Sequence, residues 1–173
     1  MSTITEQQQT TQVYRVFIKA SRQAVWDAIT RPEWTERYGY GGAVEYELRK
    51  GGSYRHLPSA EMVAAGKEHG FPVPDVIVDG EVLEADPPRR LVHTWHFMMS
   101  PDLAEDAVGT ITYELEEQEG GVTRLTLIHE LDGAPATALM VSSDDDPSHG
   151  GGGWAWVLSD LKSLLETGKR LSD

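Results

Sequence analysis

The 173-residue sequence predicts an α+β domain in which a curved antiparallel sheet of about seven strands surrounds a long C-terminal helix. Two observations predict this class. Segments of alternating apolar and polar residues follow one another across short turn signals, a pattern typical of antiparallel strands. The clearest helical periodicity lies near the two ends of the chain, at 21–38 and 154–168. Helices segregated in this way indicate α+β rather than alternating α/β architecture.

The N-terminal part combines a polar segment, a strand and two short helices. Residues 1–12 are rich in Gln and Thr, so we expect a disordered tail, and we expect residues 13–173 to form a single domain. The alternation in 13–19 predicts the first strand. Ser21 predicts the N-cap of a helix with the sequence RQAVWDAIT, and Pro32 predicts the start of a second short helix.

The middle of the chain contains six further segments with strand character, separated by glycine or proline turn signals. We predict strands at 43–50, 53–57, 76–85, 90–99, 109–117 and 122–131. Two long segments interrupt this series: an insertion at 58–75 with room for one short helix, and an acidic loop at 132–149. Loops of this length in a compact domain are often functional, and we interpret both as lids at one rim.

The final helix, predicted at 154–168, carries an apolar stripe that must be buried. The stripe consists of Trp154, Val157, Leu158, Leu161, Leu164 and Leu165, and Asp160, Ser163 and Thr167 are placed on the opposite, polar face. A twisted antiparallel sheet offers a concave face large enough to cover the stripe. Gly150–Gly153 allow the chain to turn into this helix, and Gly168 predicts its end.

Four segments in this order resemble a known superfamily: ASRQAVWDAITRPEWTERY, GEVLEADPPRRLVHTW, GTITYELEE and GGWAWVLSDLKSLLE. The chain resembles the SRPBCC (START-like) superfamily with its helix-grip fold. Within that superfamily, it resembles the family related to the C-terminal domain of the activator of the ninety-kilodalton heat-shock protein ATPase. The resemblance implies a central cavity for an apolar small molecule in many relatives, enzymatic cyclisation in some, and chaperone contact in others.

The residues predicted to face such a cavity form a mixed wall of apolar surfaces with a few polar tips, as ligand sites do. They are Trp26, Tyr46, Tyr54, Trp95, Tyr113, His129, Trp154 and Leu158. Satisfied core side chains would show the same alternation, so the pattern alone leaves both interpretations open.

The sequence contains no motif that requires a catalytic function. An enzymatic alternative, a cyclase, dehydratase or hydrolase, would use His129 or His93 as general base with Tyr113 or Tyr46 as donor. His93 and His96 have opposite strand parity, so they do not converge on one metal ion, and the chain has no cysteine. We therefore expect no metal, no cofactor and, in the leading interpretation, a non-enzymatic binding protein.

The charge balance and hydropathy limit the partners. The net charge of −13 argues against binding to nucleic acid, because phosphate backbones would repel the chain. No apolar run reaches the ~18 residues of a membrane span, and no secretory signal is visible, so we expect a cytoplasmic protein.

The leading hypothesis is that the protein binds a hydrophobic small molecule. The ligand would be a lipid or a polyketide-type natural product, held for sequestration or self-resistance. A co-chaperone-like interaction protein is a further alternative, ranked last because activators of that chaperone carry an additional N-terminal domain for which this chain leaves no room. A homodimer is left open.

Overall fold

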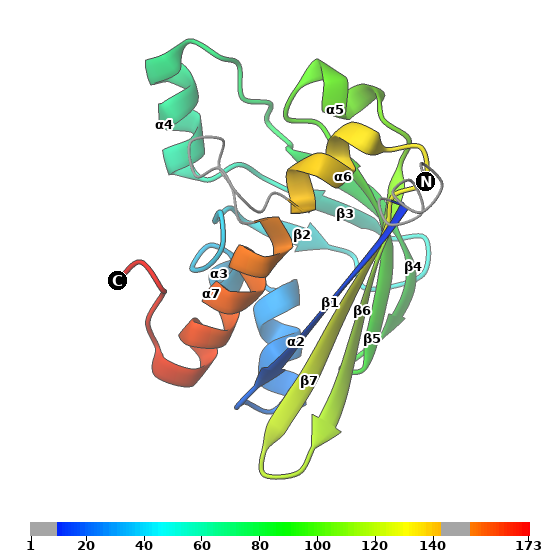
Figure 1. The fold of residues 1–173 in the computed structure, drawn as a ribbon, viewed down its shortest axis with the longest axis vertical. Helices are drawn as coiled ribbons and strands as arrows, with labels where there is room; N and C mark the ends of the chain where they lie inside the picture. Colours follow the sequence, from blue (N-terminus) through cyan, green and yellow to red (C-terminus); the bar gives the residue numbers. More distant parts are fainter. Residues whose placement is uncertain (1–9, 143–152) are drawn as a thin grey trace, which may run out of the picture.

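A seven-stranded antiparallel sheet forms the body of the domain, which confirms the predicted fold class. The computed structural model describes residues 10–142 and 153–173. The sheet has the order β1-β7-β6-β5-β4-β3-β2 and is curved (Figure 1). Its strands are β1 (Thr11–Ile18), β2 (Val44–Tyr46), β3 (Ser53–His56), β4 (Val78–Asp86), β5 (Arg90–Phe97), β6 (Gly109–Gln118) and β7 (Val122–Glu130).

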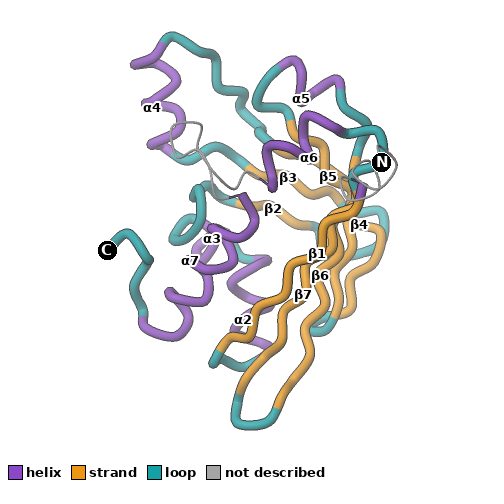
Figure 2. Tube along the Cα trace, viewed as in Figure 1, coloured by secondary structure: helices purple, strands orange, loops and turns teal. Residues whose placement is uncertain are grey.

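The helices occupy two places relative to the sheet. They are α2 (Arg22–Thr30), α3 (Pro32–Thr35), α4 (Ala60–His69), α5 (Pro101–Glu105), α6 (Pro135–Ser142) and α7 (Gly153–Thr167). Figure 2 shows α2, α3 and α7 on one side of the sheet, and α4, α5 and α6 at one end of the strands. The hydroxyl of Ser21 accepts a hydrogen bond from the backbone N–H of Ala24 and caps α2, as predicted.

The first two strands differ in length from the prediction. β1 begins at Thr11, so Thr11 and Gln12, predicted as tail, pair with Glu130 and His129 of β7. Pairing with the long strand β7 extends β1 beyond the apolar alternation on which the prediction was based. Residues 1–9 of the predicted tail lie outside the described residues. β2 spans only Val44–Tyr46, because the chain turns after Tyr46 and the backbone N–H of Arg49 bonds to the carbonyl of Glu47.

Two helices were not predicted. Residues 135–142 of the expected acidic loop form α6, which buries Ala138 and Val141 on one side. Residues 101–105 form α5, with Ser100 at its N-cap and Pro101 in its first turn. Both are short, and their helicity depends on tertiary packing that periodicity does not reveal. Residues 143–149 of the expected loop lie outside the described part of the chain.

The core lies between the inner face of the sheet and the helices α2 and α7. Leu158, Leu161 and Leu164 of α7 are buried there, as the apolar stripe predicted. Val25 of α2 and Leu127 of β7 are fully buried in the same cluster. Gly168 has a φ of +77° and ends α7, which confirms the predicted stop.

The prediction for Asp160 was wrong, because this residue is fully buried rather than on an exposed polar face. Its carboxylate accepts hydrogen bonds from the backbone N–H groups of Gly39 and Leu171, each at 2.8 Å, and from Nε of Arg170 at 3.1 Å. The segment after Gly168 folds back over this face of α7. A helical wheel shows only which side of a helix is polar and gives no sign of a later segment that covers it.

The structure explains why position 153, the last of four consecutive glycines, requires glycine. A Cβ atom at this position would lie 1.9 Å from the carbonyl oxygen of Val141, and the φ of Gly153 is +47°. Only glycine allows the first residue of α7 to approach the end of α6 this closely. Gly150–Gly152 lie outside the described residues.

Candidate functional site

Seven ring side chains meet on the inner face of the sheet. Six come from strands β2, β3, β5, β6 and β7, and the seventh comes from the first turn of α7. We call them the ring cluster: Tyr46, Tyr54, His93, Trp95, Tyr113, His129 and Trp154. All seven were candidate residues in the sequence, and cross-strand packing brings them into two groups of ring contacts.

One half of the ring cluster is built around His93. The rings of Tyr46 and Tyr54 are stacked with centroids 4.7 Å apart. The imidazole of His93 lies 4.1 Å from the Tyr54 ring and 5.4 Å from the Tyr46 ring. Tyr113 completes this half at 6.2 Å from His93. Such offset and edge contacts stabilise ring pairs beyond their buried area.

The other half is built around His129. The rings of Trp95 and His129 form a T-shaped pair at 4.9 Å, and Trp154 lies 5.9 Å from Trp95 and 6.0 Å from His129. The indole Nε1–H of Trp154 donates a hydrogen bond to Nδ1 of His129 at 3.0 Å. This bond joins α7 to the inner face of β7.

Hydrogen bonds fix the tautomer of His93. Nδ1 lies 2.8 Å from the carbonyl oxygen of Thr94, which can only accept, so Nδ1 carries the proton. Nε2 therefore accepts from the hydroxyl of Tyr46 at 3.2 Å. Burial lowers the pKa of His93 to about 4, although the bond to Thr94 acts in the opposite direction. His93 is thus neutral at pH 7 with both nitrogens partnered.

His129 has the opposite tautomer. Because Nδ1 accepts the bond from Trp154, the proton lies on Nε2. Nε2 is buried and has no hydrogen-bond partner among the described residues. Burial, together with the nearby His93, lowers the pKa of His129 to about 3. In this arrangement His129 offers a donor, and it has no free lone pair with which to act as a base.

The tyrosines of the ring cluster are neutral donors. Burial raises the pKa of Tyr46, Tyr54 and Tyr113 above the ordinary value. For Tyr54, side-chain hydrogen bonds with Trp95 and Tyr46 oppose the effect of burial. No hydrogen bond joins the hydroxyl of Tyr113 to any residue in the described ranges.

Burial differs within the ring cluster. Tyr54, His93, Trp95 and His129 are buried, whereas Tyr46, Tyr113 and Trp154 are only half-buried even though they lie on the inner side. The ring cluster therefore combines fully buried rings with half-buried ones.

Two of the predicted ligand-binding residues are not part of the ring cluster. Trp26 lies on α2 and is 4% exposed, and Leu158 lies on α7 and is similarly buried. Both belong to the hydrophobic core, and no ring contact joins Trp26 to the ring cluster in the described part of the chain. Their role in ligand binding stays a prediction.

A hollow of about 730 Å³ lies between the turn that follows α3 and the start of α4. Its walls are the turn at 39–43, the segment at 57–62 that leads into α4, Glu36 and Arg170. Residues 58–62 belong to the insertion interpreted as a lid. The backbone of Gly153 hydrogen-bonds Tyr40, so this hollow and the ring cluster both contact the start of α7.

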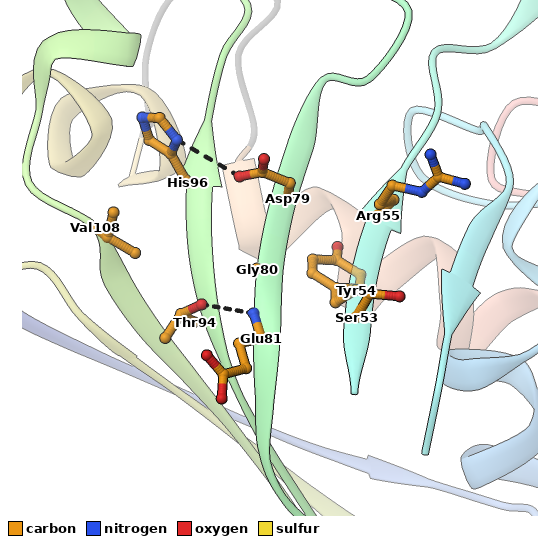
Figure 3. A pocket seen from close by; sticks show the side chains of 9 residues that line it. All are labelled: Ser53, Tyr54, Arg55, Asp79, Gly80, Glu81, Thr94, His96 and Val108. Atoms are coloured by element: carbon orange, nitrogen blue, oxygen red, sulfur yellow. Dashed lines mark hydrogen bonds and ion pairs between the residues drawn. The ribbon is translucent and has the colours of Figure 1, made fainter. Parts of the chain in front are cut away.

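A second hollow, of about 380 Å³, lies on the outer face of β3, β4 and β5 (Figure 3). Its polar walls include His96, whose Nδ1 lies 3.5 Å from the carboxylate of Asp79. The predicted opposite parity is confirmed, because His93 faces the ring cluster and His96 faces outward. Within residues 10–142 and 153–173, no group of three His, Asp or Glu side chains is placed to hold a metal ion.

One residue beside the ring cluster was not predicted. Gly109, the first residue of β6, is positioned so that a Cβ atom would lie 3.3 Å from Nε2 of His129. A glycine in a strand signals close approach of another group, but the sequence does not reveal which group. The register that places Gly109 near His129 is known only from the structure.

A family model described as "Activator of Hsp90 ATPase homolog 1-like protein" matches residues 19–166. The chain belongs to this family. The matched segment contains the whole ring cluster. No curated protein matches the chain, and no helix among the described residues is long and apolar enough to cross a bilayer.

Solved structures with the same fold include CalU16 and an HSP90 activator. CalU16 from Micromonospora echinospora is 20% identical in its solution structure, with a TM-score of 0.59 over 93% of this chain and 68% of that one. In the crystal structure of CalU16, the match spans 64% of that protein. An HSP90 activator from Plasmodium falciparum is 20% identical, with a TM-score of 0.53 over 94% and 91% of the two chains.

The Aha1 dimer from Colwellia psychrerythraea is 18% identical to this family member, with a TM-score of 0.59 over 92% and 98% of the two chains. At these identities the likeness establishes the helix-grip fold alone. Function has to be argued from the residues of this chain.

Proposed function

We propose that this domain binds a largely apolar, ring-containing small molecule between the inner face of the sheet and α7. The ring cluster carries the proposal, because Tyr46, Tyr113 and Trp154 are half-buried ring side chains on the inner side of the domain. Aromatic walls with few polar groups are typical of ligand sites. Burying apolar ligand surface contributes roughly 25 cal/mol per Å², so useful affinity needs no catalytic group.

The arrangement favours a flat, fused-ring ligand of the polyketide type over a single acyl chain. Ring faces stack on ring faces with defined offsets, whereas an acyl chain gains little from that geometry. The buried Nε2–H of His129 is unpaired within the described chain and suits an oxygen atom on such a ring system. Neither histidine has a free lone pair, which supports sequestration rather than turnover.

Native mass spectrometry of the protein purified from its own source tests the proposal. We expect a co-purifying small molecule that is released on denaturation. Tyr113→Leu removes one accessible ring and should weaken binding of that molecule about tenfold. Phe71→Leu is the matched control, because Phe71 is an exposed ring that contacts His69 and lies outside the ring cluster. Equal loss in both variants, or no bound molecule, would contradict the proposal.

The family match supports a second candidate function, contact with an Hsp90-type chaperone. The HSP90 activator from Plasmodium falciparum has the same fold. The test is the ATPase rate of the purified chaperone with and without this chain. Stimulation that Tyr113→Leu leaves unchanged would assign a chaperone role independent of the ring cluster.

A further inference from the structure

His129 holds the one buried histidine nitrogen without a hydrogen-bond partner in the described chain. The residue is 0% exposed, and its Nε2 has no nitrogen or oxygen acceptor within reach. The T-shaped contact with Trp95 supplies a ring but no such acceptor. Buried polar groups in native proteins are nearly always paired, so an orphaned donor points to a group that is not part of the protein.

Trp154 fixes which nitrogen of His129 carries the proton. An indole nitrogen can only donate, so the bond from Nε1 of Trp154 to Nδ1 of His129 keeps the imidazole proton on Nε2. The group that pairs with Nε2–H of His129 must therefore be a hydrogen-bond acceptor. A neutral acceptor suits the site, because the ring cluster contains no lysine or arginine to balance a buried anion.

The backbone of Gly109 comes close to Nε2. A Cβ atom at residue 109 would lie 3.3 Å from Nε2 and 2.7 Å from the carbonyl oxygen of Glu130, so only glycine permits this approach. Gly109 pairs with Trp95 on β5, so the donor lies at the border of the ring cluster.

We propose that His129 determines the specificity of this site: its Nε2–H selects ligands that place a neutral oxygen acceptor, such as a ring carbonyl, beside Gly109. The proposal rests on the proposed function and names the ligand chemistry of the same site. A hydrocarbon of equal shape would leave the donor buried and unpaired, which weakens binding by about tenfold or more.

His56 provides the control. It is a half-buried histidine of β3 outside the ring cluster, and its Nε2 already bonds to the carbonyl of Gly41 at 2.9 Å. His56→Phe should therefore leave the preference for an acceptor intact, whereas His129→Phe should abolish it.

The test uses fluorene and 9-fluorenone, which share one skeleton and differ by a carbonyl group. Tryptophan fluorescence titrations of the full chain should show about tenfold tighter binding of 9-fluorenone. The ratio of the two affinities should fall to about one in His129→Phe and stay near the wild-type value in His56→Phe.

Two measurements on the wild-type protein avoid dependence on a variant that fails to fold. The carbonyl stretching band of bound 9-fluorenone should shift to lower frequency, as for a hydrogen-bonded ketone. The ¹⁵N resonance of His129 Nε2 should move with 9-fluorenone and not with fluorene.

The outcomes separate the two proposals. Equal affinity for both probes, an unshifted carbonyl band, or a preference that survives in His129→Phe overturns the acceptor proposal alone; an ordered water on Nε2 would produce this result. If neither probe binds and no molecule co-purifies with the protein, the proposed function fails, and the specificity proposal fails with it.

Discussion

Trp154 and His129 form a direct hydrogen bond of 3.0 Å between the first turn of α7 and the inner face of β7. Apart from apolar packing, this bond connects the start of the helix to β7, the second strand of the sheet, at the ring cluster. It also sets the tautomer of His129, and through it the polarity that the site presents to a ligand. One indole nitrogen thus links the position of α7 to binding chemistry.

Trp154→Phe should separate these two effects. Phenylalanine keeps a ring but removes the donor, so Nδ1 of His129 loses its partner and the free energy of unfolding should fall by about 1–2 kcal/mol. The ¹⁵N spectrum of His129 should change from one tautomer to a mixture. Trp156→Phe is the control, because Trp156 lies two residues along α7 and outside the core cluster. A single unchanged tautomer in Trp154→Phe would contradict the role of the bond.

The inward direction of the ring cluster could be predicted from the sequence, and its internal pairing could not. Side chains alternate along a strand, so the parity of His93 and Trp95 is visible in the sequence. Which hydroxyl reaches His93 depends on the stagger between β2 and β5, two strands that are not neighbours in the sheet. The pairing of Tyr46 with His93 therefore had to come from the structure.

Asp160 shows a different limit of sequence reasoning. Its helical position, one turn before Leu164, places it at the edge of the apolar stripe, and its full burial depends on Arg170 and Leu171 folding back over it. Local periodicity describes one element at a time. A buried charge that joins three segments has no local signature.

Asp160→Ala should be among the more destabilising substitutions on α7. It leaves the backbone N–H groups of Gly39 and Leu171 and the guanidinium of Arg170 without their shared acceptor. We expect a loss of about 3 kcal/mol in urea unfolding. The control is Glu68→Ala on the exposed side of α4, which should change stability by less than about 0.5 kcal/mol. A comparable small change at Asp160 would show that the C-terminal segment contributes little.

The two buried histidines predict a loss of stability in mild acid. Their pKa values fall from about 6.5 in the unfolded chain to about 4 for His93 and about 3 for His129. The unfolded state binds more protons below pH 6.5, so stability is complete above that pH and declines as the pH falls toward 4 and 3. Each histidine contributes up to about 1.4 kcal/mol per pH unit in this window.

Urea unfolding of the wild type and of His129→Gln between about pH 7.5 and 4 measures this effect. This range spans the ordinary histidine pKa of about 6.5. The carboxylates titrate in both proteins, so the difference between their slopes isolates His129. We expect a shallower decline in the variant. Parallel curves would mean that His129 becomes protonated in the folded state without cost.

Gly153→Ala should displace the start of α7. The added methyl group would lie 1.9 Å from the carbonyl oxygen of Val141, and the left-handed φ of +47° is unfavourable for alanine. We expect a loss of more than about 2 kcal/mol, together with weaker binding at the ring cluster because Trp154 is the next residue. Gly168→Ala is the matched control: its φ is +77°, but nothing lies within 4 Å of the added Cβ. Gly168→Ala should therefore lose only about 1 kcal/mol to backbone strain, because its added methyl group clashes with no described residue.

If both variants lose equal stability and Gly153→Ala binds ligand normally, the close approach of α6 and α7 does not position Trp154.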